Sequence, residues 1–143
     1  MTVARILATK GRDVVTTLPH RTLREIVEVL AQKHIGAVVV VGPEGIVLGI
    51  SSERDIIRAI ARQGAAALDD AVSRHMTAKV VTTTEEGTVD RLMEQMTAGR
   101  FRHVPVIRNG KLDGVVSIGD VVKYRLDEVE SEHRALREYI ATA

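Results

Sequence analysis

Two kinds of hydrophobic pattern alternate along the chain. Short runs rich in valine and isoleucine predict buried strands at Ala37–Val41 and Ile46–Ser51, because such runs are too short and too β-branched for core helices. Between residues 22 and 34, apolar positions recur with a period of about 3.6 residues, which predicts a helix. A further helical pattern follows the second strand and ends near Gln63. The apolar face of the first helix is Leu23, Ile26, Val27, Leu30 and Ala31.

The segments between these elements carry turn and capping residues. Val3–Leu7 predicts a short helical turn, and Asp13–Thr17, rich in valine and threonine, predicts a short β segment. Thr22 is placed to cap the first helix, and Gly36 is expected to stop it. A turn at Pro43–Gly45 joins the two strands.

The same order of elements recurs in the second half of the chain, which indicates an internal repeat. Asn109 and Gly110 supply the hairpin turn of the second copy. For the strands and helices, the offset between the copies is 66 residues before this turn and 65 after it. The matched segments are Val3–Leu7 with Val72–Met76, Val14–Thr17 with Val80–Thr83, the helix after Thr22 with the helix after Thr88, Val38–Val41 with Val104–Ile107, and Gly49–Asp55 with Gly114–Asp120.

Each copy has roughly 60 residues and would bury too little surface to be stable alone. We therefore expect an α/β (α+β) fold in which two β-α-β-β-α repeats pack their sheets together about a pseudo-two-fold axis. Residues 1–66 would form the first repeat, residues 67–126 the second, and residues 127–143 a C-terminal helical extension. The cleft between the repeats would be lined by the start of the last helix of each copy.

The stretch Gly49–Asp55 lies between a predicted strand and a predicted helix. Ser52 suits the N-cap, because its hydroxyl can accept a hydrogen bond from a free backbone N–H, and Asp55 resembles the second half of a capping box. A helix start of this kind also attracts anions. Gly114–Asp120 repeats the same Gly, Ser and Asp spacing. Capping alone would explain the spacing, so a purely structural role stays open.

The composition of the 143-residue chain argues against several classes of function. The hydrophobic fraction is 45%, as in a globular protein, but only Phe101, Tyr124 and Tyr139 are aromatic. With so few stacking side chains and a net charge of +1, a nucleic-acid platform is not expected. No apolar run approaches the roughly 20 residues of a membrane helix. The absence of cysteine, and of a signal-like apolar core in residues 1–11, predicts a cytoplasmic protein.

The sequence shows no recognisable catalytic or metal-binding motif. It has no Gly-x-Ser-x-Gly elbow, phosphate-binding Walker loop or Gly-x-Gly-x-x-Gly fingerprint. No carboxylate pairs with a histidine in a recognisable triad order. We therefore expect neither an enzyme nor a metal site. His20, His34, His75 and His133 lack metal-ligand spacing and are expected on the surface.

The doubled Gly-x-x-Ser-x-x-Asp motif and the repeated element order resemble the tandem cystathionine β-synthase (CBS) domain pair, or Bateman module. The resemblance covers residues 3–126 and includes the strand entry Arg102–Val106. The chain is similar to a stand-alone bacterial pair with no catalytic or channel domain attached. Members of this family commonly bind AMP, ADP or ATP, and sometimes NAD(H) or S-adenosylmethionine, in the clefts between the repeats.

The resemblance implies roles for particular residues. Asp55 and Asp120 would accept hydrogen bonds from ribose hydroxyls, because a carboxylate offers two acceptor oxygens. Ser52 and Ser117 would cap the helices and reach the phosphate. The cations nearest the phosphates would be Arg54, Arg102 and His103. Backbone groups near Val15, Thr16, Thr17, Val81 and Thr83 would meet the adenine edge, and Ile35, Ala37 and Val104 would cover its faces.

The two copies differ in charge. Arg54 in the first motif corresponds to Gly119 in the second, whereas Arg102 and His103 correspond to Gly36 and Ala37. If the repeats face each other, these cations converge on one cleft. We therefore predict one stronger nucleotide site, built from Ser52, Arg54 and Asp55 with Arg102 and His103, and a weaker or empty site around Ser117 and Asp120.

The C-terminal segment has a heptad pattern. Its seam is Val122, Leu126, Val129, His133, Leu136 and Ile140. One interpretation is a last helix packed on its own module, and the other is helix pairing in a homodimer. The expected function is an adenine-nucleotide-binding regulatory module without catalytic activity, acting as a homodimer on a regulated partner protein. The alternative is an interaction or dimerisation scaffold whose clefts bind no ligand.

Overall fold

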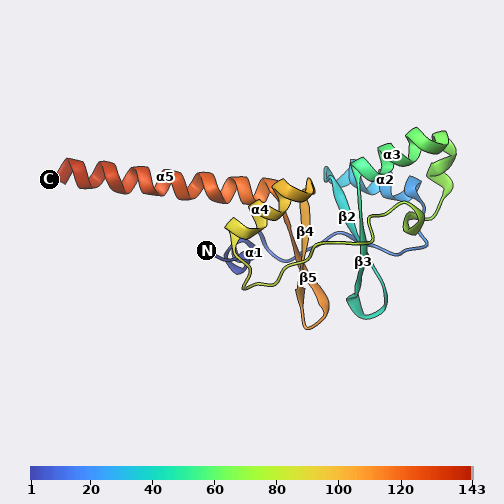
Figure 1. The fold of residues 1–143 in the computed structure, drawn as a ribbon, viewed down its shortest axis with the longest axis horizontal. Helices are drawn as coiled ribbons and strands as arrows, with labels where there is room; N and C mark the ends of the chain where they lie inside the picture. The colour runs from blue at the N-terminus through green and yellow to red at the C-terminus, as the bar shows by residue number, and fades with distance from the viewer. Residues whose placement is uncertain (143) are drawn as a thin grey trace.

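The computed structural model describes residues 1–142, which contain five α-helices and five strands (Figure 1). The chain therefore has the expected mixed α and β fold. The helices are α1 (Val3–Lys10), α2 (Leu23–Lys33), α3 (Glu53–Gln63), α4 (Val89–Gly99) and α5 (Ile118–Thr142). The strands are β1 (Thr16–Thr17), β2 (Ala37–Val41), β3 (Val47–Ser52), β4 (His103–Arg108) and β5 (Lys111–Ser117).

The first repeat forms a three-stranded sheet in the order β1-β2-β3. β1 is parallel to β2, and β2 is antiparallel to β3, with Val39 opposite Ile50. Because side chains alternate across a strand, Val38 and Val40 both point to the side where α2 and α3 form the core. Only Thr16–Thr17 of the expected β segment Asp13–Thr17 is a strand.

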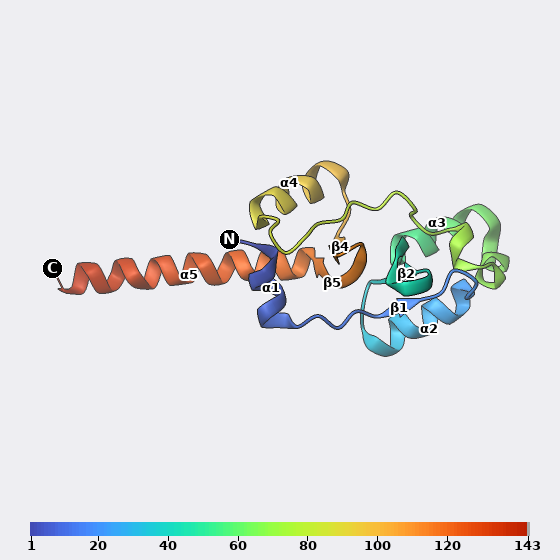
Figure 2. The same cartoon turned by 90° about the horizontal axis from the view of Figure 1, so that it is seen from below.

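The second repeat contains only the antiparallel hairpin of β4 and β5. Its register shifts between Val106 and Ile107, and the first hairpin shifts at the repeat-equivalent position, between Val40 and Val41. This shared irregularity supports the internal repeat. The two hairpins lie side by side, with the helices of each repeat on the outer sides (Figures 1 and 2).

The predicted strand Val80–Thr83 is wrong, because only Thr83 pairs with β4. Its amide donates to the Pro105 carbonyl oxygen at 3.0 Å, and its carbonyl accepts from the Ile107 amide at 2.8 Å. This single parallel bridge is the counterpart of β1 in the first repeat. Val80 and Val81 run along a pocket wall instead of along β4.

Each hydrophobic core is completed by the N-terminal segment of the other repeat. Val72 is buried in the core of the first repeat, and α1 is buried in the core of the second. The first glycine of each Gly-x-x-Ser-x-x-Asp motif leaves room for this exchange of N-terminal segments. A Cβ on Gly114 would lie 2.9 Å from Leu7 Cδ2, and a Cβ on Gly49 would lie 2.6 Å from the Thr77 carbonyl oxygen. The two repeats are therefore joined by reciprocal packing.

The reciprocal packing of the two repeats also buries His75. His75 is buried, and its Nε2 lies 2.8 Å from Asp70 Oδ2, so the expected surface position is wrong. The hydrogen bond from His75 lowers the pKa of Asp70 below its ordinary value. His75 follows Val72 into the first core, which a search for metal spacing could not reveal.

Helix α5 starts on the second repeat and continues past residue 126 without a break. Its early turns pack on the core through Val121, but its C-terminal half projects beyond the rest of the molecule (Figures 1 and 2). Val122, Leu126 and Leu136 of the heptad seam are exposed, so the seam does not pack on its own module. No helix within residues 1–142 combines the length and apolar character needed to cross a membrane.

Candidate functional site

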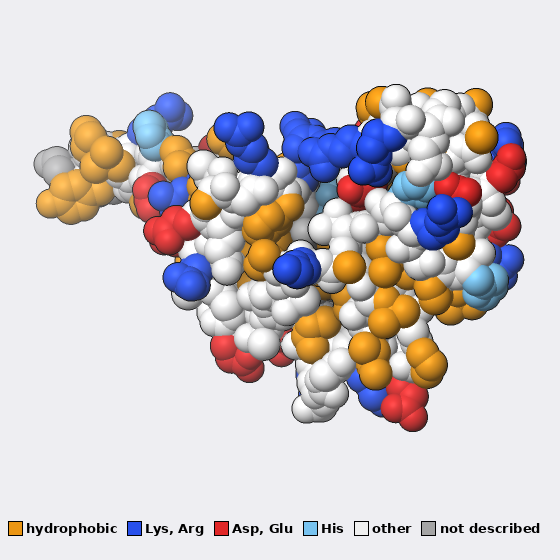
Figure 3. Space-filling view, turned by 45° about the vertical axis from the view of Figure 1, so that its right-hand side comes forward, with side chains coloured by type: hydrophobic (Ala, Val, Ile, Leu, Met, Phe, Trp, Pro, Cys, Tyr) orange, Lys and Arg blue, Asp and Glu red, His pale blue; other side chains and the backbone are white. Residues whose placement is uncertain are grey.

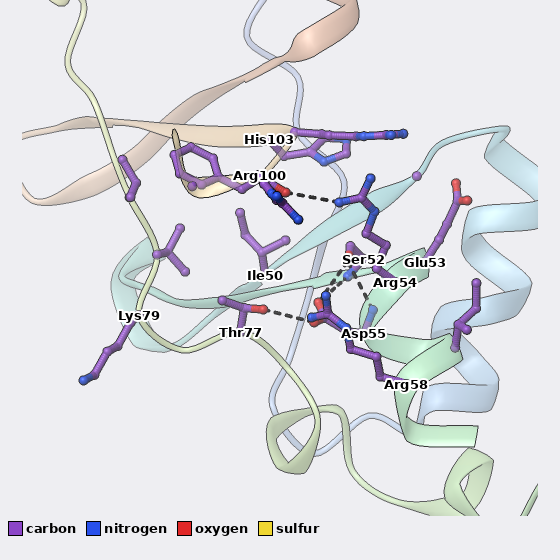
Figure 4. Close-up of a pocket in the computed structure, with 17 residues that line it drawn as sticks. Ile50, Ser52, Glu53, Arg54, Asp55, Arg58, Thr77, Lys79, Arg100 and His103 are labelled. Carbon is purple, nitrogen blue, oxygen red and sulfur yellow. Dashed lines mark hydrogen bonds between the residues drawn. The ribbon is translucent and has the colours of Figure 1, made fainter. Parts of the chain in front are cut away.

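A pocket of about 650 Å³ lies where the two repeats meet. The first repeat contributes the end of β3 and the start of α3. The second repeat contributes residues 77–81 and the connection from α4 to β4. Figure 4 shows side chains from both repeats converging on this space.

The start of α3 holds Asp55 at the pocket wall. The Asp55 amide donates to Ser52 Oγ at 3.3 Å, and the Ser52 amide donates to Asp55 Oδ2 at 2.9 Å, which completes the predicted capping box. The Ser52 hydroxyl also donates to Oδ2, and the Thr77 hydroxyl donates to Oδ1 at 3.0 Å. Asp55 is only 8% exposed. Its carboxylate is thus fixed in direction and keeps acceptor capacity on Oδ1.

The pocket carries an excess of positive charge. Only Glu53 and Asp55 among its lining residues are acidic. Within the described chain, none of the lining cations lies within 4 Å of a carboxylate oxygen. Lysine and arginine side chains gather along the junction of the two lobes (Figure 3), where they favour an anionic ligand. The lining cations are Arg54, Arg58, Lys79, Arg100 and Arg102.

Arg54 connects the two repeats across the pocket. Its Nη1 donates to the Arg100 carbonyl oxygen at 3.1 Å. That carbonyl belongs to the C-cap of α4, where Arg100 takes a left-handed conformation with φ of 56°. His34 ends α2 in the same way, with φ of 54°. α2 of the first repeat and α4 of the second therefore end in the same left-handed conformation, and the end of α4 lies within reach of Arg54 on α3.

The prediction that Gly36 stops α2 is wrong, because His34 is the C-cap. A Cβ at Gly36 would lie 2.9 Å from Glu53 Oε1 and 3.7 Å from His103 Cε1. Because Glu53 is exposed and its carboxylate is the end of a flexible side chain, it can move aside, and the position does not require glycine.

His103 lies half-buried at the start of β4. Burial lowers the pKa of His103, and Lys10 and Arg102 lower it further, against the opposing effects of Asp120 and Glu53. These surroundings favour the neutral imidazole, which can exchange hydrogen bonds with a ligand. The role of His103 beside a phosphate stays a prediction.

The pocket brings together six of the residues that the sequence singled out: Ser52, Arg54, Asp55, Val81, Arg102 and His103. Other predicted residues lie elsewhere. Thr16 and Thr17 line a separate pocket of about 340 Å³, beside Arg21 and Glu25 of the first repeat. Thr83 pairs with β4, and Val104 is fully buried in the second core, so Val104 cannot cover a ligand face.

The remaining predicted residues follow the pseudo-symmetry of the repeats. Val15, Ile35 and Ala37 precede Val81, Phe101 and His103 by the repeat offset of 66 residues. They are therefore the counterparts of pocket residues. With Ser117 and Asp120, which also lie outside the 650 Å³ pocket, they stay the predicted second position.

Asp120 has the same capping box as Asp55, but its carboxylate is already ion-paired. The Ser117 amide donates to Asp120 Oδ2 at 2.9 Å, and the Asp120 amide donates to Ser117 Oγ at 3.2 Å. Lys10 Nζ lies 2.6 Å from Asp120 Oδ2 and also donates to the Val115 carbonyl at 2.8 Å. Burial would raise the pKa of Asp120, but hydrogen bonds from Lys10 and Ser117 hold it below its ordinary value.

Several pocket residues were not predicted from the sequence. Arg58 follows Arg54 by one helical turn, so the i, i+4 spacing could have placed it on the same face. Thr77 and Lys79 lie in the N-terminal segment of the second repeat and belong to no motif. Thr77 reaches Asp55 because it forms an isolated antiparallel bridge with Ile50, next to the end of β3.

Comparison with known families agrees with this geometry. A sequence model of the CBS domain matches residues 3–62 and, a second time, residues 71–127. The chain belongs to the CBS domain family. The two matches cover the two repeats, which confirms the tandem CBS pair.

Solved CBS-domain structures share the fold of this CBS pair. A CBS-domain-containing protein from Agrobacterium tumefaciens is 53% identical, with a TM-score of 0.84 over 87% of this chain and 99% of its own. A CBS domain protein from Pyrobaculum aerophilum, solved in complex with AMP, is 29% identical, with a TM-score of 0.74 over 84% of this chain and 89% of its own. A mitochondrial CBS domain-containing protein of Arabidopsis thaliana is 35% identical over 147 aligned positions, which cover 97% of this chain and 71% of that protein.

Proposed function

We propose that this CBS pair is a non-catalytic regulatory module that binds AMP, ADP, ATP or NAD(H) in the pocket between its repeats. The observation that carries this proposal is Asp55, a buried carboxylate held by Ser52 and Thr77 beside an unpaired cluster of cations. A carboxylate suits ribose hydroxyls and arginines suit phosphates, and a nucleotide presents both groups on one molecule. The AMP complex of the Pyrobaculum relative supports this chemistry.

The pocket residues divide into three roles in this proposal. Asp55 accepts hydrogen bonds from the ribose, and Ser52 holds it in place. Arg54 and Arg102, joined by the unpredicted Arg58, Lys79 and Arg100, neutralise the phosphates. Val81 and His103 contact the base, together with Ile50 and Val80 of the same pocket. Ser117 and Asp120, with Val15, Ile35 and Ala37, form a second position that stays weak or empty, because it lacks Arg54 and Arg102 and Lys10 occupies its carboxylate.

A ligand in this pocket would contact both repeats at once. Arg54 comes from α3 of the first repeat, whereas Arg100 and Arg102 come from the connection before β4 of the second. Phosphates that draw these cations together would therefore change the angle or the rigidity between the repeats. The proposed signal is this change, sensed by a partner protein. The module is proposed to act in the cytoplasm as a homodimer.

A thermal-shift panel with AMP, ADP, ATP, NAD, NADH, S-adenosylmethionine and adenosine tests the proposal. At about 100 times its dissociation constant, a ligand should stabilise the fold by about 2.7 kcal/mol. For a chain of this size, that corresponds to a rise of about 5–10 °C in melting temperature. Arg102→Ala should remove most of the shift produced by AMP and leave the smaller shift produced by adenosine. Glu94→Ala, an exposed change on α4, should alter neither.

The ligand-free scaffold remains the rival function, and the exposed seam of α5 is the observation that favours it. The two functions give different results in the same panel. If none of the seven ligands raises the melting temperature while the protein is dimeric in solution, the scaffold replaces the nucleotide sensor.

A further inference from the structure

Helix α5 presents a complete heptad seam to solvent. Leu126 is 59% exposed, Leu136 is 58% exposed and Ile140 is 65% exposed. Alternating steps of four and three residues place Val122, Val129 and Leu136 at the d position of the heptad, and Leu126, His133 and Ile140 at the a position. A stripe of this kind on a projecting helix needs a second helix to cover it (Figure 1).

The charges that flank the seam match those of a parallel second copy. In a parallel coiled coil, each g residue faces the following e residue of the other helix. Arg125 at g would face the partner's Glu130 at e, and Glu132 at g would face the partner's Arg137 at e. Two-fold symmetry doubles both contacts, which gives four attractive pairs. Within residues 1–142, Glu130, Glu132 and Arg137 have no ion pair of their own, whereas Arg125 lies 3.6 Å from Glu128 and 3.8 Å from Asp90.

The antiparallel arrangement places like charges together. The register that pairs all six seam residues sets Val122 opposite the partner's Ile140 and Leu126 opposite the partner's Leu136. In that arrangement e faces e and g faces g. Glu130 would then face the partner's Glu130, and Glu132 the partner's Glu132. Lys123 would also face the partner's Arg137. Each of these contacts is repulsive, so the flanking charges favour the parallel orientation over the antiparallel one.

We infer that α5 pairs in parallel and in register with α5 of a second copy of this chain, as a short two-stranded coiled coil from Val122 to Ile140. The inference rests on the homodimer proposed above and specifies which surface forms it. The seam spans about 27 Å at 1.5 Å per residue. It places both CBS pairs at the same end of the coiled coil. His133 faces the partner's His133 in one layer, and a single polar a position fixes register at a cost in stability.

Introduced cysteines test the orientation directly, because the chain has no cysteine of its own. Leu136→Cys should give a disulfide-linked dimer under mild oxidation, since parallel pairing brings the two substituted positions together. Ala135→Cys, one residue off the seam, is the matched control and should stay largely unlinked. In the antiparallel register the two copies of position 136 lie about 15 Å apart, beyond the roughly 7 Å limit for a disulfide. A disulfide-linked dimer formed only when Leu126→Cys and Leu136→Cys chains are mixed would overturn the parallel arrangement.

Sedimentation velocity tests the surface itself. The unmodified chain should be a dimer, Leu136→Glu should be a monomer, and Ala135→Glu should remain a dimer, because position 135 faces away from the seam. A monomeric unmodified chain would overturn both the homodimer and the coiled coil. A dimer that tolerates Leu136→Glu would overturn the coiled coil alone. Leu136→Glu lies far from the pocket and should keep the nucleotide-induced thermal shift, so failure of this inference is distinguishable from failure of the nucleotide proposal.

Discussion

Asp55 and Asp120 begin from the same local geometry and differ in what reaches them from outside the motif. Each carboxylate accepts a hydrogen bond from the amide of the serine three residues before it. Asp55 then accepts from the neutral Thr77 hydroxyl at 3.0 Å, whereas Asp120 is paired with the Lys10 ammonium at 2.6 Å. A neutral donor leaves the negative charge available to a ligand, but an ammonium group neutralises it. This difference between the two sites therefore comes from the N-terminal segments of the two repeats.

Lys10→Met tests whether Lys10 keeps the second position closed. The substitution keeps the length of the side chain and removes its charge, so Asp120 becomes free to accept ribose hydroxyls. We expect the stoichiometry measured by calorimetric titration to rise from one nucleotide per chain toward two. Lys33→Met, an exposed change at the end of α2, should leave the stoichiometry at one. A Lys10→Met protein that still binds a single nucleotide would show that Lys10 does not block this position.

Strand β3 depends on the absence of a side chain at Gly49. A Cβ at this position would lie 2.6 Å from the Thr77 carbonyl oxygen and 2.8 Å from the Met76 sulfur. Gly49→Ala should therefore push the Thr77 segment away from β3 and lower the free energy of unfolding by about 1–3 kcal/mol. Denaturant unfolding measures this change. Gly119→Ala is the matched control, because its nearest neighbour would be Ser117 Oγ at 3.6 Å, and equal stability of the two variants would contradict the close packing.

The helices and hairpin strands could be predicted because their periodicity is a local property. α2, α3 and α4 follow from residues spaced for one buried face, and β2 follows from a β-branched run. The prediction of a strand at Val80–Thr83 was wrong because strand pairing is not a local property. The composition of this segment resembles that of β1, but pairing with β4 depends on the path of a segment that also lines the pocket. The burial of His75 was missed because it arises from the exchange of segments between the repeats.

The candidate site was predictable only on the side that carries motifs. Ser52 and Asp55 are recognisable from the capping box, and Arg102 from the strand entry that follows α4. Thr77 and Lys79 come from the N-terminal segment of the second repeat, where no spacing rule applies. Their positions follow from the fold of both halves, so only the structure could place them beside Asp55.

At the scale of the whole molecule, the charged residues of the pocket lie at the junction between the two repeats, which a ligand would have to bridge. The first repeat supplies Arg54 and Asp55, and the second supplies Arg100 and Arg102, on opposite walls of one pocket. The repeats are already linked by reciprocal core packing, so a ligand would adjust an existing arrangement and would not assemble it. The long α5 extends this arrangement away from the pocket, where it is available to a second copy (Figure 2).

Calorimetric titration of two matched variants tests the central claim most directly. Asp55→Asn and Asp120→Asn make the same change in the same capping box, and Asp120→Asn also removes the ion pair with Lys10. With the nucleotide that gives the largest thermal shift, the unmodified chain should bind about one equivalent. Asp55→Asn should weaken binding by about 10- to 100-fold, as expected for lost hydrogen bonds to a charged group, and Asp120→Asn should bind like the unmodified chain. Equal loss in both variants, or full binding by Asp55→Asn, would contradict the account.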